Sequence, residues 1–326
     1  MLDLNLPTRV FRAGRGRLKN SCTFAQKKTN TLCKMKNRKN GIALLVCAMC
    51  MLALAGCNGC SNGFVKKQKS LEVKSYALCD TVELSSDGDG QMVFVFDMEM
   101  PVAATGDTAA ISVMQDEIKR QLFAGKFVDL PFDSAMSCYR DFVVSNYRIA
   151  FKSVAKELVD KIQESADTLL VDSQRETLDN ELYITAGINF DSMGVVSYSV
   201  EQIINFGDAT NISRVQYINF NRADGSVLNE QTLYVEGYEK DLTNLLLNSM
   251  IEQTDDIALI KDLEDNDYEV NSIRPNDNFY FSSAGVIYEY NLVDIGPYIP
   301  EGTQVLVSWS KLKPLLRPEW QYLAGA

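Results

Sequence analysis

Near the carboxyl end the chain reads Asn278-Phe-Tyr-Phe-Ser-Ser-Ala-Gly-Val-Ile-Tyr-Glu-Tyr-Asn291, the most specific pattern in its folded region. Aromatic and β-branched residues are concentrated on both sides of residues 282–285, which predicts two strands joined by a tight turn. A third strand is predicted at residues 303–308, and the stretch ends with Leu312-Lys313-Pro314-Leu315. No nucleophile stands beside a base here, so we expect these residues to build structure.

Apolar alternation bounded by turn residues predicts further strands upstream of this stretch. These strands are expected at residues 73–84, 92–100, 182–190, 195–206 and 214–220. Strands that follow one another directly, with single helices between groups, favour an α+β fold with antiparallel sheet regions over repeated βαβ units.

Apolar residues at three- and four-residue spacing predict about three helices, at residues 107–124, 146–165 and 239–253. The first is expected to bury Ile111, Met114, Ile118 and Leu122, and the second to bury Ile149, Val154, Leu158 and Ile162. The acidic segments 166–180 and 262–267 are interpreted as solvated surface loops, the second of them in preference to a metal site.

The carboxyl-terminal pattern resembles the signature of the RsiV-type extracytoplasmic domain over about residues 170–318. In that family an aromatic hairpin leads to a Pro-Tyr loop, a last strand and a Leu-Lys-Pro-Leu segment. The matching residues of this chain are Phe279, Tyr280, Gly285, Tyr288, Tyr290, Pro297, Tyr298, Leu312, Lys313, Pro314 and Leu315. Gly296 stands where the family often has Ala, and residues 299–301 differ from its Ala-rich loop.

The resemblance implies a binding function rather than an enzyme activity. The family includes the extracellular part of an anti-sigma factor that senses lysozyme by binding it, and domains attached to peptidoglycan deacetylases. We therefore expect a non-catalytic module that binds a protein or a cell-wall ligand, with lysozyme among the candidates. The alternative is a histidine-free carboxylate hydrolase that acts on cell-wall glycans.

The amino-terminal segment 35–57 predicts where the protein is located. A basic flank at residues 36–39 precedes an apolar run of about 13 residues, which is too short to span a bilayer. Leu54-Ala55-Gly56-Cys57 then has the form of a lipobox. This order predicts a signal peptide, cleavage before Cys57, and acylation of the Cys57 sulfur and amino group. The expected location is the periplasmic face of the outer membrane.

The predicted organisation follows from these segments. Residues 1–34 are expected to be an overcalled start or a leader, and residues 35–56 the lipoprotein signal peptide. Residues 57–70 form the lipidated cysteine and a flexible tether. An α+β region at residues 71–165 then precedes the RsiV-type α+β domain at residues 166–320.

The charge changes sharply at the predicted cleavage site. The whole chain has 32 basic and 43 acidic residues, and residues 1–56 contain 11 of the basic residues but only one of the acidic ones. The region after residue 56 therefore has 21 basic and 42 acidic residues, which gives a net charge of −21. A field of this sign repels nucleic acid and attracts basic proteins or cations, besides favouring solubility. The expected partners are the membrane through the lipid, a basic protein such as lysozyme, or peptidoglycan fragments.

The chain contains no histidine. This excludes Ser-His-Asp and Cys-His catalysis and histidine-containing zinc sites, so we expect no metal and no cofactor. Ser153 and Lys156 match the Ser-x-x-Lys pair of penicillin-binding enzymes but lack the partner motifs. Cys79 and Cys138 are either a disulfide pair or separate small apolar residues.

Overall fold

The computed structural model describes residues 71–84, 90–103, 108–163, 179–206, 212–254, 257–296 and 302–325. The predicted leader, signal peptide, Cys57 and tether lie outside the described residues, as do Pro297 and Tyr298 of the family signature. Among the described residues, no helix is both long enough and apolar enough to cross a membrane.

A six-stranded sheet with the order β1-β2-β3-β4-β5-β6 forms the first half of the fold. Its strands are β1 (Glu72–Glu83), β2 (Gln91–Val102), β3 (Asn180–Ser192), β4 (Val195–Phe206), β5 (Ile212–Asn221) and β6 (Val227–Leu228). All neighbours are antiparallel except β2 and β3, which run parallel. The α+β class is confirmed, and the single parallel pair is a feature that the sequence did not predict.

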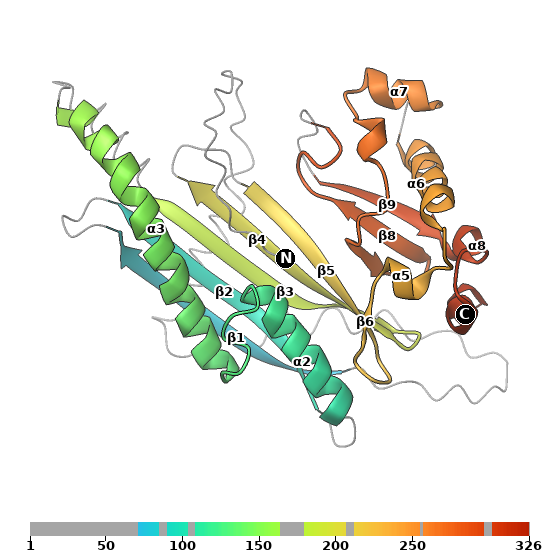
Figure 1. Ribbon diagram of the computed structural model, residues 1–326, viewed down its shortest axis with the longest axis horizontal. Coiled ribbons are helices and arrows are strands. Elements are labelled where there is room, and N and C mark those ends of the chain that lie inside the picture. Colours follow the sequence, from blue (N-terminus) through green and yellow to red (C-terminus); the bar gives the residue numbers. More distant parts are fainter. Residues whose placement is uncertain are drawn as a thin grey trace, which may run out of the picture. The chain divides into compact units, whose positions relative to one another are not determined.

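Helices α2 (Thr108–Leu122) and α3 (Phe132–Gln163) connect β2 to β3 and pack against one face of this sheet (Figure 1). Helix α2 buries the predicted stripe, and Gly125 beyond its end has the positive φ typical of a helix terminus. The prediction for α3 is wrong at its start. Its buried face begins at Phe132 and continues through Tyr139, whereas Ile149 is 72% exposed.

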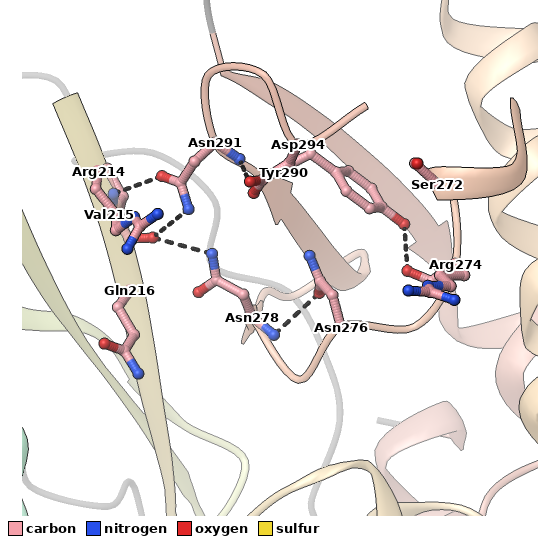
Figure 2. Close-up of a pocket in the computed structure, with 10 residues that line it drawn as sticks. All are labelled: Arg214, Val215, Gln216, Ser272, Arg274, Asn276, Asn278, Tyr290, Asn291 and Asp294. Atoms are coloured by element: carbon pink, nitrogen blue, oxygen red, sulfur yellow. Dashed lines mark hydrogen bonds between the residues drawn. The ribbon is translucent and has the colours of Figure 1, made fainter. Parts of the chain in front are cut away.

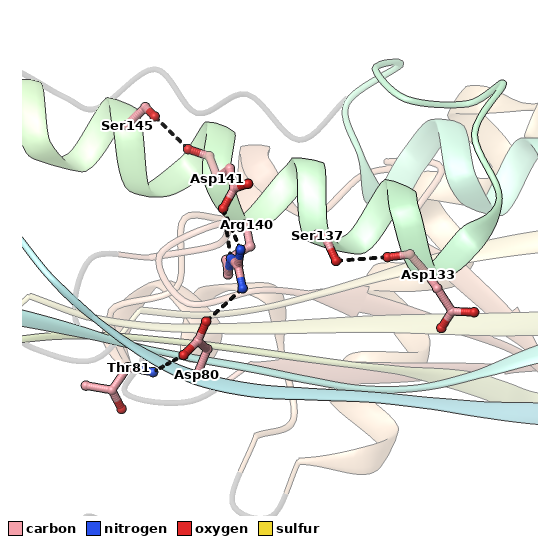
Figure 3. A network of polar contacts seen from close by, with 7 residues as sticks. All are labelled: Asp80, Thr81, Asp133, Ser137, Arg140, Asp141 and Ser145. Carbon is pink, nitrogen blue, oxygen red and sulfur yellow. Dashed lines mark hydrogen bonds and ion pairs between the residues drawn. The ribbon is translucent and has the colours of Figure 1, made fainter.

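Arg140 fixes α3 to the outer strand β1 (Figure 3). Its guanidinium donates to the Asp80 carboxylate at 2.7 Å, and its Nε and Nη2 donate to Asp141 at 2.9 and 2.7 Å. Since β1 is an edge strand, this ion pair attaches the outer strand of the sheet to the helix that covers it. Part of the pair is solvated, so its contribution is about 1 kcal/mol or less.

A second, three-stranded sheet contains β7 (Phe279–Phe281), β8 (Gly285–Tyr290) and β9 (Thr303–Ser308) in that order, all antiparallel. One of its faces packs against α6 (Glu239–Gln253), α5 (Glu230–Leu233) and α8 (Trp309–Leu312). These strands and α6 lie where the sequence predicts them.

The predicted loop at residues 262–267 is wrong over residues 262–265, which belong to helix α7 (Ile260–Asp265). The Asp262 carboxylate accepts hydrogen bonds from the backbone N–H groups of Ala258 and Leu259 at 2.9 and 2.8 Å. Leu263 is fully buried beneath it. The burial of Leu263 and the cap provided by Asp262 therefore stabilise a helix in a segment whose composition is typical of a loop.

Buried hydrogen bonds join the two sheets. Ser197 of β4 donates to the Asn219 side chain of β5 at 2.6 Å, and it accepts from the backbone N–H of Phe281 at 3.0 Å. Asn219 in turn donates to the Phe279 carbonyl at 2.7 Å. Two polar side chains of the large sheet thus bind the backbone of β7. The boundary predicted at residue 166 does not divide the sheets, because β2 and β3 pair across it.

Cys79 and Cys138 are not joined by a disulfide. On β1, Leu78 packs into the helix-covered core and Asp80 reaches Arg140 on α3. Side chains alternate along a strand, so Cys79 points to the opposite face of the sheet from α3, which carries Cys138. The structure therefore supports two separate cysteines.

Candidate functional site

The family signature builds the core of the smaller sheet. Phe279, Tyr288, Tyr290, Leu312 and Leu315 are all buried there, whereas Lys313 and Pro314 are exposed on the surface. Tyr280 points to the other face of the sheet and packs against Tyr217 of β5, with ring centroids 4.5 Å apart and the rings tilted by 30°. Most of the signature therefore forms the scaffold of the smaller sheet.

Gly285 is required by close packing. A Cβ atom at this position would lie 2.1 Å from the Val307 carbonyl oxygen and 2.8 Å from the Cα of Ser308. Both are backbone atoms of β9, so they cannot be displaced by a side-chain rotation. Glycine at residue 285 allows β8 and β9 to pair up to the turn.

A buried carboxylate that the sequence did not predict lies behind this sheet. Glu230 accepts hydrogen bonds from the Tyr238 hydroxyl at 3.0 Å and from the backbone N–H of Asp277 at 2.9 Å. Nearby, the Tyr288 hydroxyl donates to that of Tyr234 at 3.3 Å. Burial raises the pKa of the Glu230 carboxyl above its ordinary value, although these hydrogen bonds oppose the rise. Its bonds hold the turn at Asp277 in place.

The free edge of β5 is covered by two asparagine side chains. Asn291 accepts from the Val215 N–H at 2.6 Å and donates to the Val215 carbonyl at 3.1 Å. Asn278 accepts from the Tyr217 N–H at 3.0 Å and also donates to Val215 at 2.9 Å. Each amide thus acts as a neighbouring strand would, and the edge is closed to another chain.

A polar cleft of about 380 Å³ opens beside these amides. Figure 2 shows Arg214 and Arg274 on opposite sides of it, with the Tyr290 ring between them. The Tyr290 hydroxyl donates to the Arg274 carbonyl at 2.9 Å and fixes that backbone. The lining residues are Arg214, Val215, Gln216, Ser272, Arg274, Asn276, Asn278, Tyr290, Asn291 and Asp294.

A second hollow, of about 420 Å³, lies on the face of the large sheet opposite α2 and α3. It carries the carboxylates of Asp97, Glu99 and Glu201, and no lysine or arginine lines it. Glu201 accepts from the Thr185 hydroxyl at 3.1 Å. The lining residues are Asp97, Glu99, Thr185, Ala186, Gly187, Ser199, Glu201, Val215 and Tyr217.

Tyr217 forms one side of this hollow. Burial raises the pKa of its hydroxyl, and the nearby negative charges of Glu289 and Glu201 raise it further. Tyr217 therefore remains neutral at physiological pH, and its aromatic ring packs against that of Tyr280. Carboxylates beside an aromatic pair form a surface suited to the basic and apolar side chains of a partner.

The described residues contain no group of three or more acidic or cysteine side chains placed to hold a metal ion. The carboxyl groups whose pKa is raised, Glu230 and Glu289, are buried and hydrogen-bonded, and neither lines one of the two hollows. Ser153 and Lys156 lie within helix α3, as the sequence indicates.

Residues 231–310 match the family described as "Protein of unknown function (DUF3298)". This segment contains the three strands of the smaller sheet and every cleft residue except those of β5. No curated protein matches the chain.

Two solved structures of similar fold carry the same family name. A DUF3298 member from Bacteroides fragilis NCTC 9343 has 19% identity and a TM-score of 0.67, and the match covers 79% of this chain and 98% of that one. A DUF3298 protein from Pseudomonas aeruginosa PAO1 has 15% identity and a TM-score of 0.52, with 77% and 97% covered. Identities this low show the fold alone, but both matches extend well beyond residues 231–310.

Proposed function

We propose that this protein is a non-catalytic lipoprotein of the cell envelope that binds a basic protein, with lysozyme as the first candidate. The observation that carries the proposal is the acidic hollow on the helix-free face of the large sheet. Asp97, Glu99 and Glu201 gather there from two strands, without a cationic side chain in the lining. The sequence adds a net charge of −21 for the region after residue 56.

Charge complementarity selects the class of partner. A cluster of carboxylates on a surface of the same overall sign steers a basic protein toward it and speeds the encounter. Attraction alone does not give a specific complex, which needs about 1,000 Å² of buried surface and well-packed anchors. Tyr217, held by its contact with Tyr280, supplies a rigid aromatic anchor beside the carboxylates.

The location is part of the same proposal. A lipid on Cys57 and the tether that follows it place the folded region at the periplasmic face of the outer membrane. Lysozyme reaches the envelope from outside and acts on the wall that this compartment contains. A tethered binder of basic proteins would therefore meet it where the wall is attacked.

The experiment is a titration of residues 61–326 with lysozyme, at about 0.15 M and about 1 M ionic strength. The Debye length falls from about 8 Å to about 3 Å between these conditions, so a purely electrostatic encounter disappears. We expect binding that weakens at high salt but remains measurable. No binding at low salt, or its complete loss at high salt, would contradict the proposal.

Two variants with equal changes of charge locate the interface. The hollow variant carries Asp97→Asn, Glu99→Gln and Glu201→Gln. The control carries Glu236→Gln, Glu264→Gln and Asp265→Asn, which change three exposed carboxylates elsewhere. We expect at least a tenfold loss of affinity in the hollow variant and less than a threefold loss in the control. Equal losses in both would show non-specific attraction.

The hydrolase alternative makes a different prediction from the same hollow. Glycoside hydrolysis needs two carboxyl groups on either side of the scissile bond, and Glu99 and Glu201 are candidates for this role. Release of reducing sugar from purified peptidoglycan, abolished by Glu99→Gln or Glu201→Gln alone, would favour the hydrolase. Absence of turnover together with lysozyme binding would favour the binding module.

A further inference from the structure

We propose that the cleft at the edge of β5 is a carboxylate-binding site that accepts a short peptide rich in carboxylates, such as the stem peptide of the bacterial wall. The proposal is independent of lysozyme binding, since it uses another hollow and the opposite charge. It rests on the two arginines, on the rigid amide frame beside them and on the backbone of the two turns that form the rim.

The arginines of the cleft differ from every other arginine in the described part of the chain. Arg120, Arg140 and Arg222 pair with carboxylates, and Arg148 and Arg317 donate to backbone carbonyls. Only the two arginines of the cleft have neither kind of partner among the described residues.

Arg214 and Arg274 nevertheless belong to a chain in which acidic residues outnumber basic ones, 43 to 32. Carboxylates are therefore plentiful, yet among the residues that the structure describes none forms an ion pair with either guanidinium. Asp294 lines the same cleft, but its carboxylate accepts from the backbone N–H of Asn291 at 2.7 Å. Two planar guanidinium groups facing one cleft are the donors that suit a carboxylate best.

The frame between the arginines is rigid. Asn278 and Asn291 are both fixed to the Val215 backbone, and Asn276 donates to the Glu289 carbonyl at 2.9 Å. The Gln216 side chain lines the cleft and forms no hydrogen bond with another described residue, so its amide is available to a ligand. Because the asparagine side chains are already fixed, the conformational entropy lost on binding comes mainly from the two arginine side chains.

The turns at the rim hold unusual backbone conformations. Asp277 has φ of 56° and Val293 has φ of 64°, although neither is glycine. The second case is notable because Val293 is β-branched and 61% exposed, so burial of its side chain does not offset the strain. Such strain persists where surrounding contacts impose it, and it often accompanies binding sites.

The dimensions and charges of the cleft define the ligand. A volume of about 380 Å³ accommodates a few amino-acid residues, near the lower end for small-molecule sites. Guanidinium groups on two sides favour a ligand with two separated carboxylates, and Asp294 can accept a hydrogen bond from an ammonium group. Wall stem peptides combine carboxylates with an amine, whereas neutral glycans lack both.

The test is calorimetric titration of the chain from Cys57, with Cys57→Ser to keep it soluble, with the tripeptide L-Ala-γ-D-Glu-diaminopimelate. The same peptide with its carboxylates amidated is the ligand control. We expect millimolar or tighter binding of the free acid and at least tenfold weaker binding of the amide. Equal affinity for the two peptides, or no heat from either up to 10 mM, would overturn the proposal.

Variants assign the site. Arg214→Gln and Arg274→Gln should each lower the affinity at least fivefold, while Lys240→Gln with Lys261→Gln, both exposed, should change it less than twofold. Since both arginine side chains are exposed, the variants should have the melting temperature of the wild-type protein. Arginine variants that bind normally would show that these side chains are merely solvated. Unchanged lysozyme binding in the same variants would separate this site from the acidic hollow.

Discussion

Replacement of Gly285 by alanine tests the packing argument most directly. The new Cβ would lie 2.1 Å from the Val307 carbonyl oxygen, about 1 Å closer than packed atoms allow. The atoms in the way belong to the backbone of β9, so β8 and β9 must separate where Gly285 pairs with Ser308. The adjacent bond from the Trp309 N–H to the Ala284 carbonyl, 3.1 Å long, would be stretched with them.

The cost combines two terms. Overpacking of a well-packed interior costs about 1–3 kcal/mol, and loss of one backbone hydrogen bond adds about 1 kcal/mol. We therefore expect Gly285→Ala to lower the free energy of unfolding by about 3 kcal/mol. For a domain of this size each kcal/mol corresponds to about 2–4 °C, so the melting temperature should fall on the order of 10 °C.

The assay is thermal and urea denaturation followed by far-UV circular dichroism. Gly237→Ala is the matched control, because Gly237 has φ of 80° but no atom within 4 Å of an added Cβ. That variant carries only the backbone strain of about 1 kcal/mol. If Gly285→Ala melted at or above the temperature of Gly237→Ala, the close approach of β8 and β9 would not be what requires glycine.

Three further predictions concern the edge of β5, the buried carboxylate and the anchor. Asn291→Ala removes the acceptor of the Val215 N–H, so we expect the free energy of unfolding in urea to fall by about 1–3 kcal/mol. Asn248→Ala is the control, because Asn248 is exposed, and it should leave that free energy unchanged. Equal urea midpoints for the two variants would refute the role of Asn291 in covering the edge of β5. Glu230 has a pKa raised above its ordinary 4.5, so the folded state retains its proton longer and the stability that this group contributes falls as pH rises above about 4.5. Glu230→Gln should therefore gain stability relative to the wild type between pH 4.5 and pH 8, and a constant difference across that range would contradict the shift. Cys57→Ser should leave the precursor uncleaved and without lipid, and normal labelling with radioactive palmitate would disprove the anchor.

The sequence predicted best those elements that local pattern determines. Strand β4 and helix α6 have the bounds that alternation and helical spacing predict, because each has one buried face. The start of α3 was missed because Phe132 and Tyr139 bury a face within a segment rich in aromatic residues and turn signals. The parallel pairing of β2 with β3 was also missed, since the choice of neighbour depends on where two helices return the chain.

The two hollows could not be predicted from the sequence, because they depend on contacts between distant segments. Arg214 and Arg274 are far apart in the sequence, and neither belongs to a motif. They line one cleft because Asn278 and Asn291, together with the buried bonds of Ser197 and Asn219, attach the smaller sheet to the large one. The two asparagines flank the aromatic hairpin, so a signal was present at its ends, although their bonds to another strand could not be predicted.

The residues that stabilise the fold are largely distinct from the charged residues of the two hollows. Phe279, Tyr288 and Gly285 are buried or closely packed, so they preserve the hairpin whatever the ligand is. The charged groups of the two hollows lie outside the signature, on β2, β4, β5 and the segment that contains Arg274 and Asp294. A substitution at Glu99 or Arg214 can change the charge of a hollow without loss of core packing. The hairpin residues therefore maintain the fold, while the two proposed binding sites of this chain depend on the charged residues beside β5.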